Sequence, residues 1–241
     1  MNILCFFIGA IRNDLLEIKN NITMFKRTLE LQRNKNKFNI KYVLITRNPD
    51  NVNPYNIDEL YKELGNSVEI VIEEPDLEML NIKCKNNATV IGLTFHTHIK
   101  DYINKCKSEF DFIIKCRNDM LIRLNNINKY FNENLVVVPP RYWFNEDKNN
   151  LSNDHFYIMH YKHFNELDFT YKNIKILSQI SHDCEEVNYN LIKPNKVIDF
   201  NDISEYKLNG SLKFHILFGN LKSLNCHQYI RIFQKFINNN K

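Results

Sequence analysis

The 241-residue sequence contains no apolar run that approaches the roughly 20 residues a membrane-spanning helix needs. Its hydrophobic start, ILCFFIG, is short, lacks a basic leader and is followed at once by Arg12 and Asp14. We interpret this start as a core strand, not as a signal peptide or a membrane anchor. The net charge of +4 is too small an excess for a dedicated nucleic-acid binder, and the lysines are spread along the chain instead of clustering with aromatic residues.

The six cysteines include no CxxC pair, and no cysteine or histidine group has the spacing of zinc ligands. Cys5 and Cys116 lie inside apolar runs, where a thiol usually packs as a small hydrophobic group. We interpret all six cysteines as reduced, which predicts a cytoplasmic protein. His96 and His98 are two residues apart on an expected helix, so they should lie on different faces and should not share a metal ion.

The chain also lacks an internal repeat and a clear interdomain linker, and its 44% hydrophobic content can bury a core, so one domain is expected. Apolar runs that suit strands alternate with helical patterns along the first half. This alternation predicts an α/β fold with a mixed, mainly parallel sheet flanked by helices. The expected strands are residues 3–9, 40–47, 68–74, 111–116, 135–138 and 155–160, and the expected helices are 15–33, 56–65, 88–107, a helix that begins at 184, and a final helix at 227–237.

Polar and charged residues follow each of the first four expected strands. Because ligands in open α/β sheets gather outside the carboxyl ends of the strands, these residues are predicted to form one site. The four strand ends carry Gly9 and Arg12, Thr46 and Arg47, Glu73 and Glu74, and Lys115, Arg117 and Asp119.

Each residue type in this set suits a diphosphate ligand. Gly9 allows the backbone to approach a ligand closely, and Arg12 begins a helix whose free N–H groups favour anions. Arg117 has a planar fork that matches a phosphate, and the carboxylate of Asp119 suits a divalent cation that bridges two phosphates. The alternative for each residue taken alone is an ordinary surface position, since strands end at the surface.

Four segments resemble the WavE-like and related polysaccharide glycosyltransferases. FFIGAIRND resembles their opening strand-glycine-x-x-arginine segment, and FDFIIKCRNDMLI resembles their YDYIIKxRxDxxI segment. SNDHFYIMHYKHF and CEEVNYNLI resemble two later segments, in the same order. The resemblance implies a single GT-A-like domain over residues 1–241, with a nucleotide-sugar-binding half at 1–122 and an acceptor-side half at 123–241. It implies transfer of a sugar from a nucleotide-diphosphate donor to a glycan, a lipid-linked glycan or another hydroxyl acceptor.

The resemblance also implies roles for individual residues. Asp119 would fill the place of the acidic motif that binds Mn²⁺ or Mg²⁺. The meeting of the strand ends at one edge, in turn, predicts that the donor is bound by Gly9, Arg12, Thr46, Lys115 and Arg117. Arg117 stands where the commoner D-x-D motif has its first aspartate, so strict metal dependence is open and Arg117 can itself neutralise part of the diphosphate charge.

Two carboxylates are candidates for the base that removes the proton of the acceptor hydroxyl. Asp154 precedes an expected strand, and its alternative role is that of a turn residue. Glu185 is the rival base, although Glu185 and Glu186 also suit the first turn of a helix, where acids complement the dipole. Trp143 suits either stacking on a sugar or core packing.

Two further expectations concern function and partners. The alternative to an enzyme is a catalytically inactive nucleotide-sugar-binding module of the same fold. No nucleic-acid partner is expected. Arg231 and Lys235 lie one turn apart on the final helix, which fits either peripheral membrane contact or a solvated face. The polar loop at 146–153 is the best candidate for a mobile lid.

Overall fold

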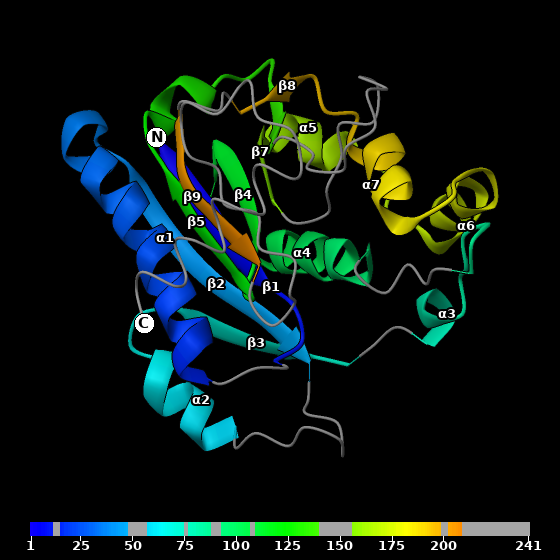
Figure 1. Ribbon diagram of the computed structural model, residues 1–241, viewed down its shortest axis with the longest axis horizontal. Coiled ribbons are helices and arrows are strands. Elements are labelled where there is room, and N and C mark those ends of the chain that lie inside the picture. The colour runs from blue at the N-terminus through cyan, green and yellow to red at the C-terminus, as the bar shows by residue number, and fades with distance from the viewer. Residues whose placement is uncertain are drawn as a thin grey trace, which may run out of the picture.

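The computed structural model describes residues 1–11, 15–47, 57–74, 77–87, 93–106, 109–139, 156–198 and 202–208. A seven-stranded sheet in the order β3-β2-β1-β4-β7-β6-β8 forms the middle layer, and β5 and β9 form a second, two-stranded sheet. Helices α1 and α2 cover one face of the large sheet, and α4 with α5 to α7 lie on the other side (Figure 1). This confirms the predicted α/β fold with a mixed, mainly parallel sheet.

The strands are β1 (Asn2–Ile8), β2 (Asn39–Arg47), β3 (Glu69–Glu73), β4 (Phe112–Arg117), β5 (Met120–Leu124), β6 (Val136–Val138), β7 (Phe156–His160), β8 (Lys196–Val197) and β9 (Ile203–Leu208). The helices are α1 (Leu15–Asn36), α2 (Ile57–Leu64), α3 (Leu77–Leu80), α4 (Thr94–Lys105), the 3₁₀ helix η2 (Ile127–Tyr130), α5 (Tyr161–Glu166), α6 (Tyr171–Ile180) and α7 (Cys184–Ile192). The predicted final helix at 227–237 and the predicted lid at 146–153 lie outside the described residues.

Strands β3, β2, β1 and β4 run parallel and end at one edge. Ile8, the last residue of β1, pairs with Ile45 of β2 on one side and with Arg117 of β4 on the other. Arg47 of β2 in turn pairs with Glu73 of β3. The chain therefore brings its first four strand ends to the same level, as the pattern of buried apolar runs predicted.

Helix α1 packs on the sheet through one apolar stripe. Ile18, Ile22, Phe25 and Leu29 recur every three or four residues, and all are buried. Phe25 meets Phe7 of β1 edge to face, with ring centroids 6.1 Å apart. Each such side chain contributes on the order of 1.5–3 kcal/mol through its removal from water. This packing fixes α1 beside the carboxyl end of β1.

The alternation of side chains along β4 decides which face carries the charged residues. Ile114 and Cys116 belong to the core under α1, whereas Ile113 belongs to the core under α4 and α7. Because successive side chains in a strand point to opposite faces, Lys115 and Arg117 lie on the α4 side. Burial raises the pKa of the Cys116 thiol to about 12, which agrees with its predicted role as a small hydrophobic group.

Helix α6 is an element that the sequence pattern did not predict. Only Ile174 and Ser178 are buried along it, while Ile176 and Ile180 are exposed. Apolar residues on both faces blur the 3.6-residue period from which a helix is recognised. The helix is nevertheless capped, because the hydroxyl of Thr170 accepts a hydrogen bond from the Asn173 amide.

Asp202 holds the second sheet against the core. Asp202 is buried, with 3% of the residue exposed. Its carboxylate accepts hydrogen bonds from Tyr130 Oη at 2.6 Å and from Asn126 Nδ2 at 3.1 Å. Lys129 Nζ pairs with the same group. Burial opposes ionisation of Asp202, but the hydrogen bonds from Lys129, Tyr130 and Asn126 outweigh it and hold the pKa below its usual range.

We expect Asp202→Asn to lower the free energy of unfolding at pH 7 by about 1–3 kcal/mol, because it weakens a buried network. Because the pKa of Asp202 is lower in the folded protein than in the unfolded chain, its ionised form stabilises the fold at a pH above the unfolded-state pKa of about 3.9. This stabilisation is lost as the pH falls through the folded-state pKa. Urea unfolding between pH 7 and pH 3 should therefore show that the difference in free energy of unfolding between the wild type and Asp202→Asn becomes smaller as the pH falls. The exposed substitution Glu133→Gln serves as the control, and a deficit that does not change with pH would contradict this account.

Candidate functional site

The turn between β4 and β5 is anchored by Asn118, which is 1% exposed. The Asn118 amide donates to the Ile8 carbonyl at 2.9 Å, and its side-chain Nδ2 donates to the Gly9 carbonyl at 2.8 Å. The Asn118 carbonyl accepts from Asn21 Nδ2 of α1 at 3.2 Å. One side chain and its own backbone therefore join the ends of β1 and β4 to α1.

Gly9 occupies a position that requires glycine. Its φ of 136° lies in a region that residues with a side chain rarely adopt. A Cβ atom at this position would lie 2.7 Å from Asn118 Oδ1. The backbone therefore passes close to Asn118, which takes the space that a side chain at residue 9 would need. The approach of a ligand to Gly9 stays a prediction.

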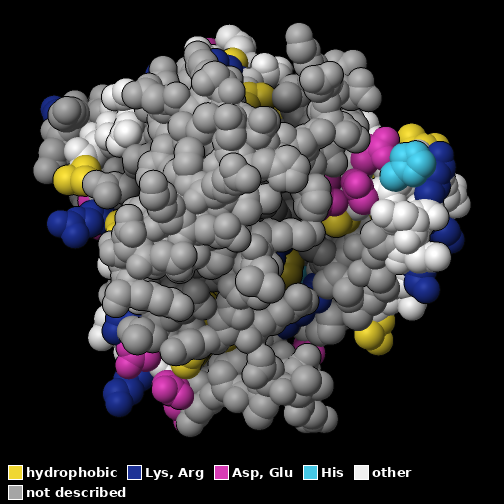
Figure 2. All heavy atoms as spheres, viewed as in Figure 1, with side chains coloured by type: hydrophobic (Ala, Val, Ile, Leu, Met, Phe, Trp, Pro, Cys, Tyr) yellow, Lys and Arg dark blue, Asp and Glu magenta, His cyan; other side chains and the backbone are white. Residues whose placement is uncertain are grey.

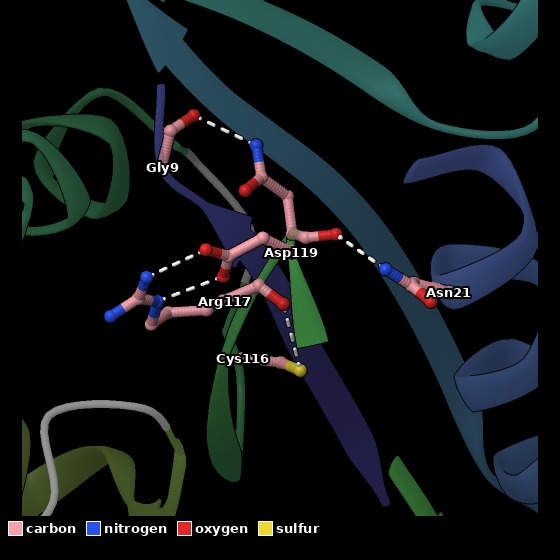
Figure 3. A network of polar contacts seen from close by, with 6 residues as sticks. Gly9, Asn21, Cys116, Arg117 and Asp119 are labelled. Atoms are coloured by element: carbon pink, nitrogen blue, oxygen red, sulfur yellow. Dashed lines mark hydrogen bonds and ion pairs between the residues drawn. The ribbon is translucent and has the colours of Figure 1, made fainter. Parts of the chain in front are cut away.

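Arg117 and Asp119 face each other directly beyond the end of β4 (Figure 3). Arg117 Nε donates to Asp119 Oδ1 at 2.9 Å, and Nη2 donates to Oδ2 at 2.6 Å. This two-point geometry is the strong form of an arginine–carboxylate pair. The side chains are 29% and 22% exposed, so the pair lies at the surface of the site and not in the core.

The same contacts bear on the predicted metal site. The Asp119 carboxylate is engaged by a guanidinium, which repels a divalent cation, and the residues that the structure describes contain no group of three or more His, Cys, Asp or Glu that suits a metal ion. A cation at Asp119 would therefore have to displace the guanidinium and take its other oxygen ligands from substrate phosphates and water. The role of Asp119 as a metal ligand stays a prediction.

Lys115 and Thr46 are buried, whereas Arg117 is partly exposed at the edge of the sheet. Lys115 is 1% exposed, with its Nζ 6.0 Å from the ring centroid of Tyr157 on β7. Thr46 is fully buried, and its hydroxyl has no hydrogen-bond partner among the described residues. A ligand at the sheet edge would therefore meet Arg117 first, and the predicted direct roles of Lys115 and Thr46 remain predictions.

The ends of β2 and β3 support helix α4. Arg47 donates a hydrogen bond to the Thr94 hydroxyl, and its guanidinium carbon lies 4.7 Å above the Phe95 ring. Glu73 faces His98, with 3.7 Å between Oε2 and Nδ1. These two residues thus reach the predicted edge of the sheet but pair with the start of α4.

Helix α7 presents Glu185 in its first turn. The Asp183 side chain accepts from the Glu186 amide at 2.9 Å, and Glu186 Oε2 accepts from the His182 amide at 2.6 Å, so Glu186 has the capping role considered for one of the two acids. Cys184 Sγ lies 3.3 Å from Glu185 Oε2. Figure 2 shows acidic side chains gathered where α7 lies, at the edge of the face in view.

Two of the predicted site residues lie outside the described residues. They are Arg12 and Asp154. Trp143 lies outside them as well. Among the described residues, Gly9, Arg117 and Asp119 lie together at the sheet edge, whereas Glu185 lies on α7 and its part in the site stays a prediction.

Sequence reasoning missed Asn118, which joins the strand ends at the site, and the buried contact between His96 and Asn188. Asn118 is a polar residue in a turn, and its position between Arg117 and Asp119 is the only feature of the sequence that could have indicated a role in the site. Asn188 and His96 are fully buried and 3.0 Å apart, between Oδ1 and Nε2, although 92 positions separate them in the chain. His96 and His98 do have different partners, which confirms that they lie on different faces of α4.

The strand order, the helical layers and the strand-end site define a GT-A fold. The galactosyltransferase LgtC, in complex with donor and acceptor sugar analogs, has a similar structure, with a TM-score of 0.52 and 9% identity over 83% of this chain and 74% of that chain. An active-site mutant of LgtC gives a TM-score of 0.51 with the same identity and coverage. The apo glycosyltransferase GlyE of Streptococcus pneumoniae TIGR4 gives 0.47 at 12% identity, over 83% of this chain and 46% of that one.

The likeness to the two LgtC structures establishes the fold of this chain. No family model and no curated protein matches the sequence. Within the described part of the chain, no helix is both long and apolar enough to span a membrane.

Proposed function

We propose that the protein is a glycosyltransferase that moves a sugar from a nucleotide-diphosphate donor to a hydroxyl group of an acceptor. The observation that carries the proposal is the position of Arg117. Arg117 is the last residue of β4 and lies level with Ile8 at the end of β1, one residue before Gly9. In sheets of this kind, that edge is where ligands bind.

Arg117 is the group proposed to bind the donor diphosphate. Its fork now holds the Asp119 carboxylate, whose two oxygens occupy the positions that two phosphate oxygens would take. Both side chains are partly exposed, so the exchange of a carboxylate for a phosphate requires no opening of the core. Asp119 would then keep Arg117 extended and correctly oriented before the donor arrives.

The chemical step follows from these charges. The acceptor hydroxyl oxygen attacks the anomeric carbon, the bond from that carbon to the diphosphate oxygen breaks, and the nucleoside diphosphate leaves with the electron pair. In an inverting transfer, a carboxylate takes the hydroxyl proton as the new bond forms. Arg117 stabilises the negative charge that grows on the leaving diphosphate. Because Asp119 is paired with Arg117 in this structure, no step of this proposal is assigned to a metal ion.

Asp154 and Glu185 are the candidates for the base. Glu185 lies in the first turn of α7, which leaves its carboxylate near the end of a capped helix. Asp154 lies just before β7, the strand that pairs with β4. Only a carboxylate that touches the acceptor qualifies, and the two can be separated by substitution.

Further parts of the proposal concern partners and setting. We propose a glycan or a lipid-linked glycan as acceptor, a role in polysaccharide biosynthesis of the WavE-like kind, and a cytoplasmic protein with peripheral membrane contact. The four resembling segments and the reduced state expected of the cysteines support these points. The second candidate function, a nucleotide-sugar-binding module without turnover, differs only in lacking the base.

The test is a transfer assay over a panel of UDP-, GDP- and dTDP-sugars with glycan acceptors. The loss of a general base typically costs 10²–10⁴-fold in rate, so either Asp154→Asn or Glu185→Gln should lower kcat by about that factor while donor binding persists. Glu186→Gln, which alters a cap, is the matched control. Donor binding with no turnover across the panel would favour the binding module, and no donor binding at all would reject both functions.

A further inference from the structure

A column of buried polar side chains connects the strand that carries Arg117 to the helix that carries Glu185. Lys115 of β4 pairs in register with Tyr157 of β7. Tyr157 Oη lies 3.3 Å from His96 Nδ1 on α4. His96 Nε2 lies 3.0 Å from Asn188 Oδ1 on α7. Because four separate elements meet in it, this column can fix their relative positions.

The partners of His96 define its protonation. Asn188 Oδ1 is an acceptor, so His96 Nε2 must carry the hydrogen and donate. His96 Nδ1 is then the acceptor in the neutral ring, and Tyr157 Oη donates to it. Burial raises the pKa of Tyr157, which keeps this hydroxyl protonated and able to donate. The hydrogen bonds therefore run in one direction, from Tyr157 through His96 to Asn188.

Aromatic packing holds the His96 ring in one orientation. The ring stacks on Phe169 with centroids 4.8 Å apart and planes 5° apart, and on Tyr157 at 5.7 Å and 15°. His96 is fully buried, so no water competes for its nitrogen atoms. These ring contacts restrict the orientation of the His96 ring, in which Nε2 faces the side chain of Asn188.

Asn188 transmits this constraint to Glu185. The two residues are three positions apart on α7, so they lie on neighbouring faces of the same helix, one turn apart. Asn188 is fully buried against α4, whereas Glu185 is partly exposed. The Asp183 cap marks where the helix begins, and the burial of Val187, Leu191 and Ile192 sets which face of α7 meets the core. The hydrogen bond with His96 adds a directional contact to that buried face.

We propose that His96 is a positioning residue for the transfer reaction: through Asn188, it fixes the rotation of α7 and thereby the place of the Glu185 carboxylate. The inference rests on the proposed function for its catalytic consequence. Its structural part, that His96 orders the first turns of α7, stands independently. A shift of a catalytic group by about 1 Å can cost about 10²-fold in rate, so a residue that does not touch substrate can still control turnover.

The test compares three substitutions. His96→Phe keeps a flat ring between Tyr157 and Phe169 but removes the donor to Asn188. His96→Gln retains a side-chain N–H that can reach Asn188. Tyr157→Phe is the matched control, because it removes the hydrogen bond between Tyr157 and His96 and leaves the bond to Asn188 in place.

The first readout is hydrogen–deuterium exchange of the peptide that covers α7, followed by mass spectrometry. We expect faster exchange in His96→Phe and near-normal exchange in His96→Gln and Tyr157→Phe. This readout does not depend on activity, so it decides the structural part even if no transfer is found. Unchanged exchange of α7 in His96→Phe would overturn the proposal.

The second readout is kinetic. His96→Phe should lower kcat by about 10²-fold with little change in the donor KM, because α7 is misplaced while Arg117 is untouched. In a Glu185→Gln background, His96→Phe should cost little more, since the group it positions is already gone. If the fold-decrease in kcat of the double variant equals the product of the two single fold-decreases, His96 does not act through Glu185. A chain that binds no donor would reject the proposed function and leave the exchange result to decide this one.

Discussion

Arg117→Gln should lower kcat/KM for sugar transfer by about 10²–10³-fold, the usual cost of removing one charged or dipolar group that stabilises a transition state. The reason is geometric. The guanidinium lies at the joined ends of β1 and β4 with its fork already filled by two carboxylate oxygens at 2.9 and 2.6 Å. Glutamine has neither the charge nor the fork. The measurement is steady-state transfer with the best donor of the panel.

Two further substitutions show which property of Arg117, its charge or its planar fork, is needed for transfer. Arg117→Lys keeps the charge but not the planar fork, so it should recover only part of the activity. Arg27→Gln removes an exposed cation from α1 and should leave transfer unchanged. If Arg117→Gln behaves like Arg27→Gln, Arg117 has no role at the diphosphate.

Gly9→Ala should destabilise the protein by about 1–3 kcal/mol from the backbone alone, since φ is 136° at this position. A further cost comes from the new Cβ, which would lie 2.7 Å from Asn118 Oδ1. Because Asn118 joins β1 to β4, its displacement should also weaken nucleotide binding at the strand ends. Urea unfolding and nucleoside diphosphate titration of the same variant measure the two effects.

The background substitution Asn118→Ala separates the two causes. It removes the atom that the new Cβ would meet but leaves the backbone angle as it is, so Gly9→Ala should cost less there than in the wild type. Equal costs in both backgrounds would mean that the contact with Asn118 contributes nothing. No measurable cost in either would show that the backbone of residue 9 differs from the one described.

The sheet was predictable because buried parallel strands leave a simple pattern. Each of the strands β1, β2, β3 and β4 contains a run of apolar residues, and polar residues follow each run. Parallel strands end at one edge, so the gathering of Gly9 and Arg117 there followed from the order of elements alone. The pairing of β5 with β9 was not predicted. Only a two-residue turn separates β4 from Met120, so in the sequence β5 looked like a continuation of β4.

The side-chain partners were less predictable, because they depend on distances that no pattern encodes. Arg117 and Asp119 were assigned to separate roles, yet they bind each other. The meeting of His96 with Asn188 joins residues 92 positions apart and follows only from the packing of α4 against α7. Local periodicity placed His96 on a helix face but could not say what that face meets.

The measurement that tests the central claim most directly is a titration of UDP, GDP and dTDP against the wild type, Arg117→Gln and Asp119→Asn, with and without Mn²⁺, followed by thermal stability and calorimetry. We predict that at least one nucleoside diphosphate raises the melting temperature of the wild type and that Arg117→Gln abolishes this rise. Asp119→Asn should retain the rise without metal, because the substitution releases the guanidinium of Arg117. A rise that needs Mn²⁺ and disappears in Asp119→Asn would instead make Asp119 the metal ligand predicted from the sequence. No rise with any nucleotide, or an unchanged rise in Arg117→Gln, would contradict a diphosphate site at this edge of the sheet.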